Sequence, residues 1–195
     1  MEAKIQKQIV DYFSFFDEFH SAVKTNLKDC QNLAATINKL IKRCKHIIEA
    51  DVTGTPLENF EFLQSKLSAS IHNLISGTVV EIRRKQSTLE DLCEQLFNKN
   101  KALRDNCREA NLDNKSTLVK GTPLQPPLEQ LLEFADDTIT FASQAYAQIE
   151  TAINILSFKE LNTISLGDHF WYPLNWDKRI KEINLYTSFI TENQI

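Results

Sequence analysis

The first fifty residues carry a heptad pattern of apolar side chains that is sustained for six repeats. Alternating steps of four and three residues from Ile5 reach thirteen positions, of which twelve are apolar. These positions are Ile5, Ile9, Tyr12, Phe16, Phe19, Val23, Asn26, Cys30, Leu33, Ile37, Leu40, Cys44 and Ile47. Since residues three and four apart share one face of a helix, the pattern predicts a long helix of the coiled-coil type.

A second apolar row lies beside this seam. It consists of Phe13, Leu27, Ala34, Ile41 and Ile48. One partner helix does not cover a seam and a second row, so we expect a bundle of three or more helices. The polar exception in the seam, Asn26, either fixes the register of the packed helices or is partly exposed, and the pattern leaves both interpretations open.

Turn-forming residues are scarce, with 4 glycines and 5 prolines in 195 residues. Sandwiches and barrels need many turns, and a nucleotide-binding sheet needs a Gly-rich loop, so these folds are excluded. We therefore predict an all-α fold, an elongated bundle of long coiled-coil-like helices with a short C-terminal helix. The length suits a single helical domain over residues 1–195.

The turn residues that are present divide the chain into predicted helices. We expect long helices over about 3–50, 56–110 and 127–160, an aromatic loop over 165–176 and a C-terminal helix over 176–192. The second helix has a clear start signal, in which Thr55 is the N-cap, Pro56 opens the first turn and Glu58 completes a capping box. Apolar residues from Leu57 and Phe60 onward follow at helical spacing.

Charge and hydropathy argue against two classes of protein, those that bind nucleic acid and those that span a membrane. The formal net charge is −4, and residues 121–195 hold 10 acidic but only 4 basic residues. Without a basic field, we expect no direct binding of nucleic acid. No stretch approaches about 20 apolar residues, so no membrane span is expected. The polar N-terminus lacks a signal peptide, which indicates the cytoplasm or the nucleus.

Motifs for catalysis, cofactors and metals are missing from the sequence. Cys30 and Cys44, like Cys93 and Cys107, are 14 residues apart. Within one helix this spacing is about 21 Å, too far for a disulfide, and no C-x-x-C zinc spacing occurs. No phosphate-binding loop is present. We therefore expect a non-enzymatic protein with no catalytic residue, cofactor or metal. An enzyme that uses the adjacent Asp168 and His169 is the weakest of our hypotheses.

The C-terminal third concentrates large aromatic side chains. Trp171, Tyr172 and Trp176 surround Pro173 in a predicted loop. Either they cap the end of the bundle, or they anchor a partner, since Trp and Tyr are enriched at interface hot spots. Our candidate partner-interface residues are Phe158, Leu161, Trp171, Tyr172 and Trp176.

Two segments point to a known family. The first is Leu27-Lys28-Asp29-Cys30-Gln31 followed by Leu33. The second is a Pro-rich loop before Leu131-Leu132-Glu133-Phe134, with Phe158, Leu161, Ile164 and Trp171 further on at offsets of 0, 3, 6 and 13. These segments resemble the AAA+ ATPase-interacting ribosome maturation factors (AIRIM), which usually have Trp at the position of Phe158. The related partner subunit CINP, the cyclin-dependent-kinase-interacting protein, is similar in its helical chain and tryptophan-containing C-terminal segment.

The resemblance implies a small accessory subunit that joins AAA+ ATPase subunits and a CINP-like helical subunit. Such a complex releases assembly factors from maturing pre-60S ribosomal particles and is linked to the turnover of replisome proteins. The ATPase would be the enzyme, and this chain its adaptor. The long first helix by itself also fits a different class, a coiled-coil structural subunit of a mitotic spindle or kinetochore assembly.

Overall fold

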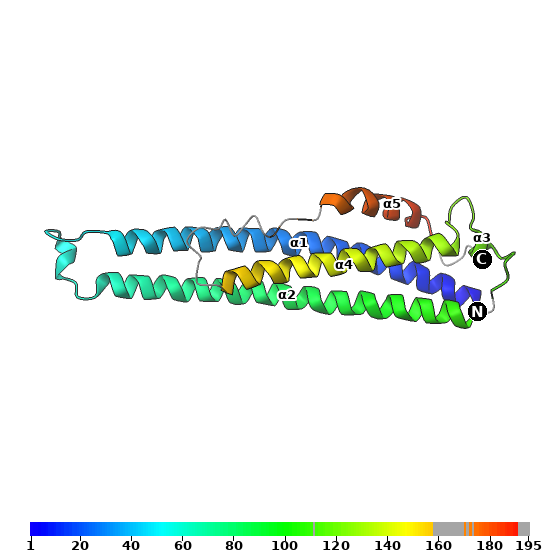
Figure 1. Cartoon of the computed structure of the whole chain (residues 1–195), viewed down its shortest axis with the longest axis horizontal. Coiled ribbons are helices and arrows are strands. Elements are labelled where there is room, and N and C mark those ends of the chain that lie inside the picture. The colour runs from blue at the N-terminus through cyan, green and yellow to red at the C-terminus, as the bar shows by residue number, and fades with distance from the viewer. Residues whose placement is uncertain (111, 158–169, 171, 173, 191–195) are drawn as a thin grey trace. The chain divides into compact units, whose positions relative to one another are not determined.

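The chain folds into long helices joined by loops (Figure 1). The computed structural model describes all residues except 111, 158–169, 171, 173 and 191–195. The helices are α1 (Glu2–Glu49), α2 (Leu63–Glu109), α3 (Thr117–Lys120), α4 (Leu128–Ser157) and α5 (Asp177–Thr187), with short 3-10 helices at Pro56–Asn59 and Leu174–Trp176. The described residues contain no strand apart from an isolated bridge between Thr122 and Gln125. The prediction of an all-α helical bundle is confirmed.

The chain forms two compact units. Unit 1 consists of Met1–Thr25, Thr88–Ala147 and Tyr172–Ile195, and unit 2 consists of Asn26–Ser87 and Gln148–Trp171. Helices α1, α2 and α4 each contribute residues to both units. That residues 1–195 behave as a single domain stays a prediction.

The core of unit 1 is built from apolar side chains of α1, α2, α4 and α5. Its fully buried members include Ile9, Phe16, Phe19, Leu89, Leu96, Phe134, Phe141 and Ile183. Each such side chain contributes about 1.5 to 3 kcal/mol when it leaves water. The small residues Ala135, Ala142 and Ala145 of α4 are also fully buried, which allows the neighbouring helices to approach closely.

Buried polar groups join the helices of unit 1. The carbonyl oxygen of Ala135 accepts hydrogen bonds from the Tyr12 hydroxyl at 3.0 Å, from Thr138 Oγ1 at 2.8 Å and from Asn100 Nδ2 at 3.3 Å. These bonds satisfy groups on α1, α2 and α4 that would otherwise be costly to bury. Burial raises the pKa of Tyr12 well above its ordinary value, so the hydroxyl stays protonated.

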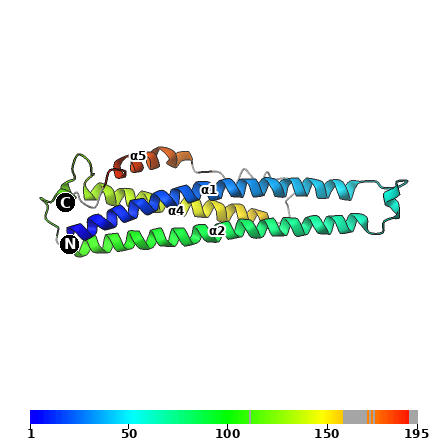
Figure 2. The ribbon, with the colours of Figure 1, turned by 180° about the vertical axis from the view of Figure 1, so that it is seen from behind.

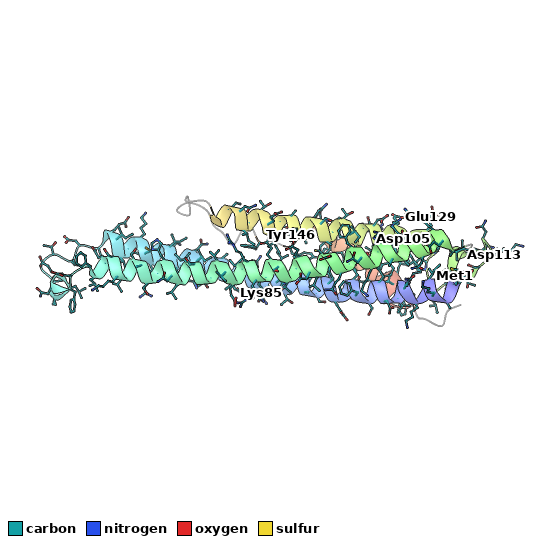
Figure 3. The ribbon with its side chains drawn as sticks, turned by 90° about the horizontal axis from the view of Figure 1, so that it is seen from below. Met1, Lys85, Asp105, Asp113, Glu129 and Tyr146 are labelled. Carbon is teal, nitrogen blue, oxygen red and sulfur yellow. The ribbon has the colours of Figure 1, made fainter. Side chains whose placement is uncertain are left out.

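Unit 2 contains a helical hairpin in which the α1 and α2 segments run antiparallel (Figures 1 and 2). The buried residues of this unit include Leu27, Cys30, Ala34, Ile37, Ile71, Ile82, Ile149 and Ala152. Polar side-chain contacts join the α1 and α2 segments of the hairpin. Lys85 Nζ, labelled on α2 in Figure 3, lies 2.6 Å from Asp29 Oδ2 of α1, and Cys44 Sγ lies 3.2 Å from Ser68 Oγ.

The heptad seam of α1 is confirmed as the buried face of the helix. Ten of its thirteen positions are buried, and Leu33, Leu40 and Ile47 are half-buried. Asn26 is buried as well, so the structure does not support the interpretation that it is partly exposed. In the second row, Phe13, Leu27 and Ala34 are buried, whereas Ile48 near the end of α1 is exposed.

The second long helix begins later than the sequence predicts, at Leu63 instead of residue 56. Thr55 is an N-cap as expected, but it caps the 3-10 helix Pro56–Asn59. That helix cannot continue into α2, because Phe60 is extended and Phe62 has a φ of 60°, in the left-handed region. Both conformations interrupt the hydrogen bonds that an uninterrupted helix needs.

Candidate protein-interaction site

Tyr172 and Trp176, two of the predicted interface residues, both pack against Phe141 of α4. Each ring centroid lies 5.9 Å from that of Phe141. Trp176 Nε1 donates to Gln144 Oε1 at 2.6 Å, and the Tyr172 hydroxyl is 2.8 Å from His20 Nε2. Both residues are half-buried, so they cover the edge of the core and keep part of their surface accessible.

His20 of α1 is the titratable group at the centre of this aromatic cluster. Its ring lies 5.9 Å from both Phe141 and Tyr172. Burial lowers the pKa of His20, Lys24 lowers it further, and Asp17 and Asp177 oppose the shift. The imidazole is therefore neutral at pH 7, and Nε2 can accept a hydrogen bond from the Tyr172 hydroxyl.

The Tyr172 ring is also in contact with a cation. Lys24 Nζ lies 5.2 Å from the ring centroid, at the distance of a cation–π interaction. Burial raises the pKa of Tyr172 to about 12, and Asp177 acts in the same direction. The hydroxyl therefore remains a hydrogen-bond donor at neutral pH, which agrees with a neutral His20 as its acceptor.

Arg179 fixes α5 to α4 within unit 1. Its Nε donates to Asp137 Oδ2 at 2.7 Å, and Nη2 donates to Glu133 Oε1 at 2.9 Å. The guanidinium also lies 5.0 Å from the ring centroid of Phe134. On the same helix, Ile180 and Ile183 are buried. Two acidic side chains of α4, Glu133 and Asp137, therefore bind Arg179 of α5 within unit 1.

The end of α5 and the Pro-rich loop before α4 form a shallow apolar hollow. Its volume is about 430 Å³, and its lining includes Leu124, Leu185, Tyr186 and Phe189. All four side chains are exposed. The loop is held by a close backbone approach, because a Cβ on Gly121, where φ is 80°, would lie 2.7 Å from the Pro127 nitrogen.

A second exposed apolar surface lies in unit 2, in the loop between α1 and α2. We call residues 50–62 the hairpin loop. It contains Leu57, Phe60 and Phe62, which are 48%, 61% and 72% exposed. No residue of the hairpin loop is buried. The helical spacing of Leu57 and Phe60 predicts that both lie on the apolar face of a helix, but in the structure both are exposed.

One signal in the sequence could have identified this surface. Phe60 and Phe62 are two residues apart, and residues at that spacing do not share a face of a helix. A helix that began at Pro56 would therefore expose at least one of the two aromatic rings. The remaining predicted interface residues, Phe158, Leu161 and Trp171, lie outside the described residues, as do Asp168 and His169.

The four cysteines are free thiols, and Cys30 and Cys44 are buried on the seam of α1 as predicted. Burial raises the pKa of both Cys30 and Cys93 to about 11, so these thiols are protonated at neutral pH. Within the described residues, no group of three or more His, Cys, Asp or Glu side chains is placed to hold a metal ion. None of the described helices has the length and apolarity that crossing a membrane requires.

These features define a helical bundle with solvent-exposed apolar surfaces. The model of one family, CA109-like, described as "Ribosome biogenesis protein C1orf109-like", matches residues 3–169. The chain therefore belongs to this family of ribosome biogenesis proteins, the family that its sequence resembles. The match ends before Tyr172, Trp176 and α5. A search of curated proteins found no match.

Proposed function

We propose that the chain is a non-enzymatic adaptor subunit of an AAA+ ATPase complex that matures pre-60S ribosomal particles. The single observation that carries the proposal is the family match over residues 3–169, which associates the chain with ribosome biogenesis. In this proposal the ATPase releases assembly factors from the particle, and the adaptor connects the ATPase to a CINP-like helical subunit. The complex would act in the cytoplasm and the nucleus and would also contribute to the turnover of replisome proteins.

The surfaces of the two units are consistent with an adaptor. Unit 1 exposes Leu124, Leu185 and Phe189, and unit 2 exposes Phe60 and Phe62. Exposed clusters of large apolar side chains are typical of sites of protein contact. Two such surfaces in different units would give the chain two places to bind, which is what a connecting subunit needs.

The proposal is tested by purifying the tagged full chain from cells and identifying its partners by mass spectrometry. We expect AAA+ ATPase subunits and a second small helical protein, and co-sedimentation with pre-60S particles. ATP hydrolysis should be found with the ATPase and not with the isolated chain. Recovery of neither partner would overturn the proposal. Localisation to the spindle without sedimentation on pre-ribosomes would instead support a mitotic coiled-coil subunit.

A further inference from the structure

The hairpin loop presents large apolar side chains that nothing described in unit 2 covers. In Figures 1 and 3 the loop forms the end of the α1–α2 hairpin, and no other described segment of unit 2 lies over it. Loops that serve only as connections are normally polar, because the exposure of apolar side chains to water is unfavourable. Leu57, Phe60 and Phe62 depart from this rule within six residues.

The conformation of the loop is fixed by its own polar groups. Asp51 Oδ1 accepts from the Thr53 backbone N–H at 2.9 Å, and Glu58 Oε2 accepts from the Gly54 N–H at 2.9 Å. Thr55 Oγ1 donates to the Val52 carbonyl oxygen at 2.7 Å. Such Asx-type and capping bonds order a turn without burying any side chain.

The loop is also closed at its base. Gln64 Nε2, in the first turn of α2, donates to the carbonyl oxygens of Ile47 at 3.0 Å and of Ala50 at 2.7 Å. One amide of α2 thus binds the Ile47 carbonyl in the last turn of α1, which has no partner within its own helix, and the carbonyl of Ala50, the residue that follows α1. Gln64 follows the exposed residues in the chain, and Ile47 and Ala50 precede them, so these bonds connect the two ends of the loop.

The backbone of Phe62 is strained. Its φ of 60° lies in the left-handed region, which large L-residues rarely adopt. Strain of this kind persists only where the flanking structure imposes it. The result is that the backbone that carries the apolar side chains is held in one conformation before any partner arrives, and less conformational freedom is lost on binding.

The charge around these side chains indicates the chemistry of the partner. Within residues 50–62, Asp51, Glu58 and Glu61 are acidic and no Lys or Arg occurs, whereas Glu49 just before the loop is paired with Lys45 at 3.7 Å. A negative surface repels the phosphates of nucleic acids and of anionic membranes. It attracts a protein surface on which Lys or Arg side chains surround an apolar pocket.

We propose that the hairpin loop docks, through Leu57, Phe60 and Phe62, into an apolar pocket of a partner protein whose rim carries Lys or Arg side chains. The inference rests on the proposed function as a partner-binding subunit, and it names the surface that makes one of the contacts. The aromatic rings supply the apolar contact, and Glu61 and its acidic neighbours orient the approach.

Photo-crosslinking of the full chain in cells tests this directly. p-Benzoylphenylalanine replaces Phe62 in one sample and Phe97 in the control, an exposed phenylalanine on the α2 segment of unit 1. We expect position 62 to give a protein adduct at least tenfold above position 97. The crosslinked peptide should contain apolar residues flanked by Lys or Arg. An adduct with lipid, with a second copy of the chain, or with a peptide that lacks basic residues would overturn the proposal.

Two substitutions separate the apolar and the electrostatic contributions. In the chain that carries p-benzoylphenylalanine at position 62, Phe60→Ser should reduce the yield of the protein adduct at least tenfold, because it removes the neighbouring aromatic ring. Glu61→Lys should reduce it several-fold at low ionic strength and less in high salt, because screening weakens the attraction. Helicity, measured by circular dichroism, should be unchanged in both, since neither side chain is buried. An unchanged yield in both variants would contradict the docking.

Co-purification with the wild-type chain and with Phe60→Ser/Phe62→Ser, compared with the crosslinking result, distinguishes this inference from the proposed function. Suppose that the wild type recovers the AAA+ ATPase, and Phe60→Ser/Phe62→Ser recovers every component equally. The docking of the loop is then wrong while the adaptor function stands. Suppose instead that no ATPase is recovered, but position 62 still gives the expected adduct. The adaptor function is then wrong, and the loop is confirmed as the binding surface of another complex.

Discussion

Phe16 and Phe62 have the same side chain in opposite surroundings. Phe16 is 1% exposed on the seam of α1, beside Phe19 and Phe141. Phe62 is 72% exposed and has a left-handed backbone. Substitution at the two positions should therefore change stability in opposite directions.

We predict that Phe62→Gly raises the free energy of unfolding by about 0.5 to 1 kcal/mol. Glycine removes the steric cost of the left-handed backbone, about 1 to 2 kcal/mol, and adds a smaller entropy cost. Phe16→Ala, in contrast, should lose about 3 to 5 kcal/mol, because it leaves a cavity. Urea denaturation measures both values, and a clear loss of stability in Phe62→Gly would show that the ring packs against the protein.

His20 should make the stability of the chain depend on pH. Its folded-state pKa lies below the ordinary value of 6.5, so the unfolded chain takes up the proton first as the pH falls. The free energy of unfolding should therefore fall as the pH drops below about 6.5 and through the folded-state pKa. Above that range the contribution of His20 is fully present.

The contribution of His20 is measured by difference. His20→Gln should flatten the pH dependence of thermal unfolding between about pH 7 and 5 relative to the wild type. Equal slopes in the wild type and His20→Gln would show that burial does not perturb this imidazole.

At the scale of elements, the apolar seam of α1 determines which face of this helix packs against the other helices. Phe16→Asp would place a carboxylate in the buried core, beside the rings of Phe19 and Phe141. We predict a loss of about 4 kcal/mol or more, seen as a large decrease in melting temperature by circular dichroism. Ser14→Asp, two residues away on the exposed face, should change the melting temperature little. Equal melting curves for Phe16→Asp and the wild type would refute the seam.

Helix α2 shows where sequence periodicity reaches its limit. Its apolar residues were expected to continue one face from Leu57 onward, yet Ile71 is 4% exposed whereas Leu67 and Leu74 are exposed. The pattern identifies which residues can share a face, but burial needs a neighbouring helix on that face. Within unit 2, the hairpin covers Ile71 and leaves the other two in water.

At the scale of the whole molecule, we predict one cooperative thermal transition. Helices α1 and α2 are continuous between residues 25 and 26 and between residues 87 and 88, so each unit contains part of the same helices. Cooperativity is typical of single domains. Circular dichroism and tryptophan fluorescence should give coincident curves. The fluorescence is measured in Trp171→Phe, so that Trp176, a residue of unit 1, is the only tryptophan. An earlier change in its fluorescence than in helicity would contradict a single domain.

The sequence by itself determined the helical class, the buried seam of α1, the burial of Cys30 and Cys44, and the family to which the chain belongs. These properties follow from local periodicity and from residue order, which are present before the chain folds. The tertiary structure decided that Tyr172 and Trp176 pack on Phe141, and that Phe60 and Phe62 remain in water. Such contacts join residues far apart in the chain or depend on the absence of a covering neighbour, and a one-dimensional pattern contains neither kind of information.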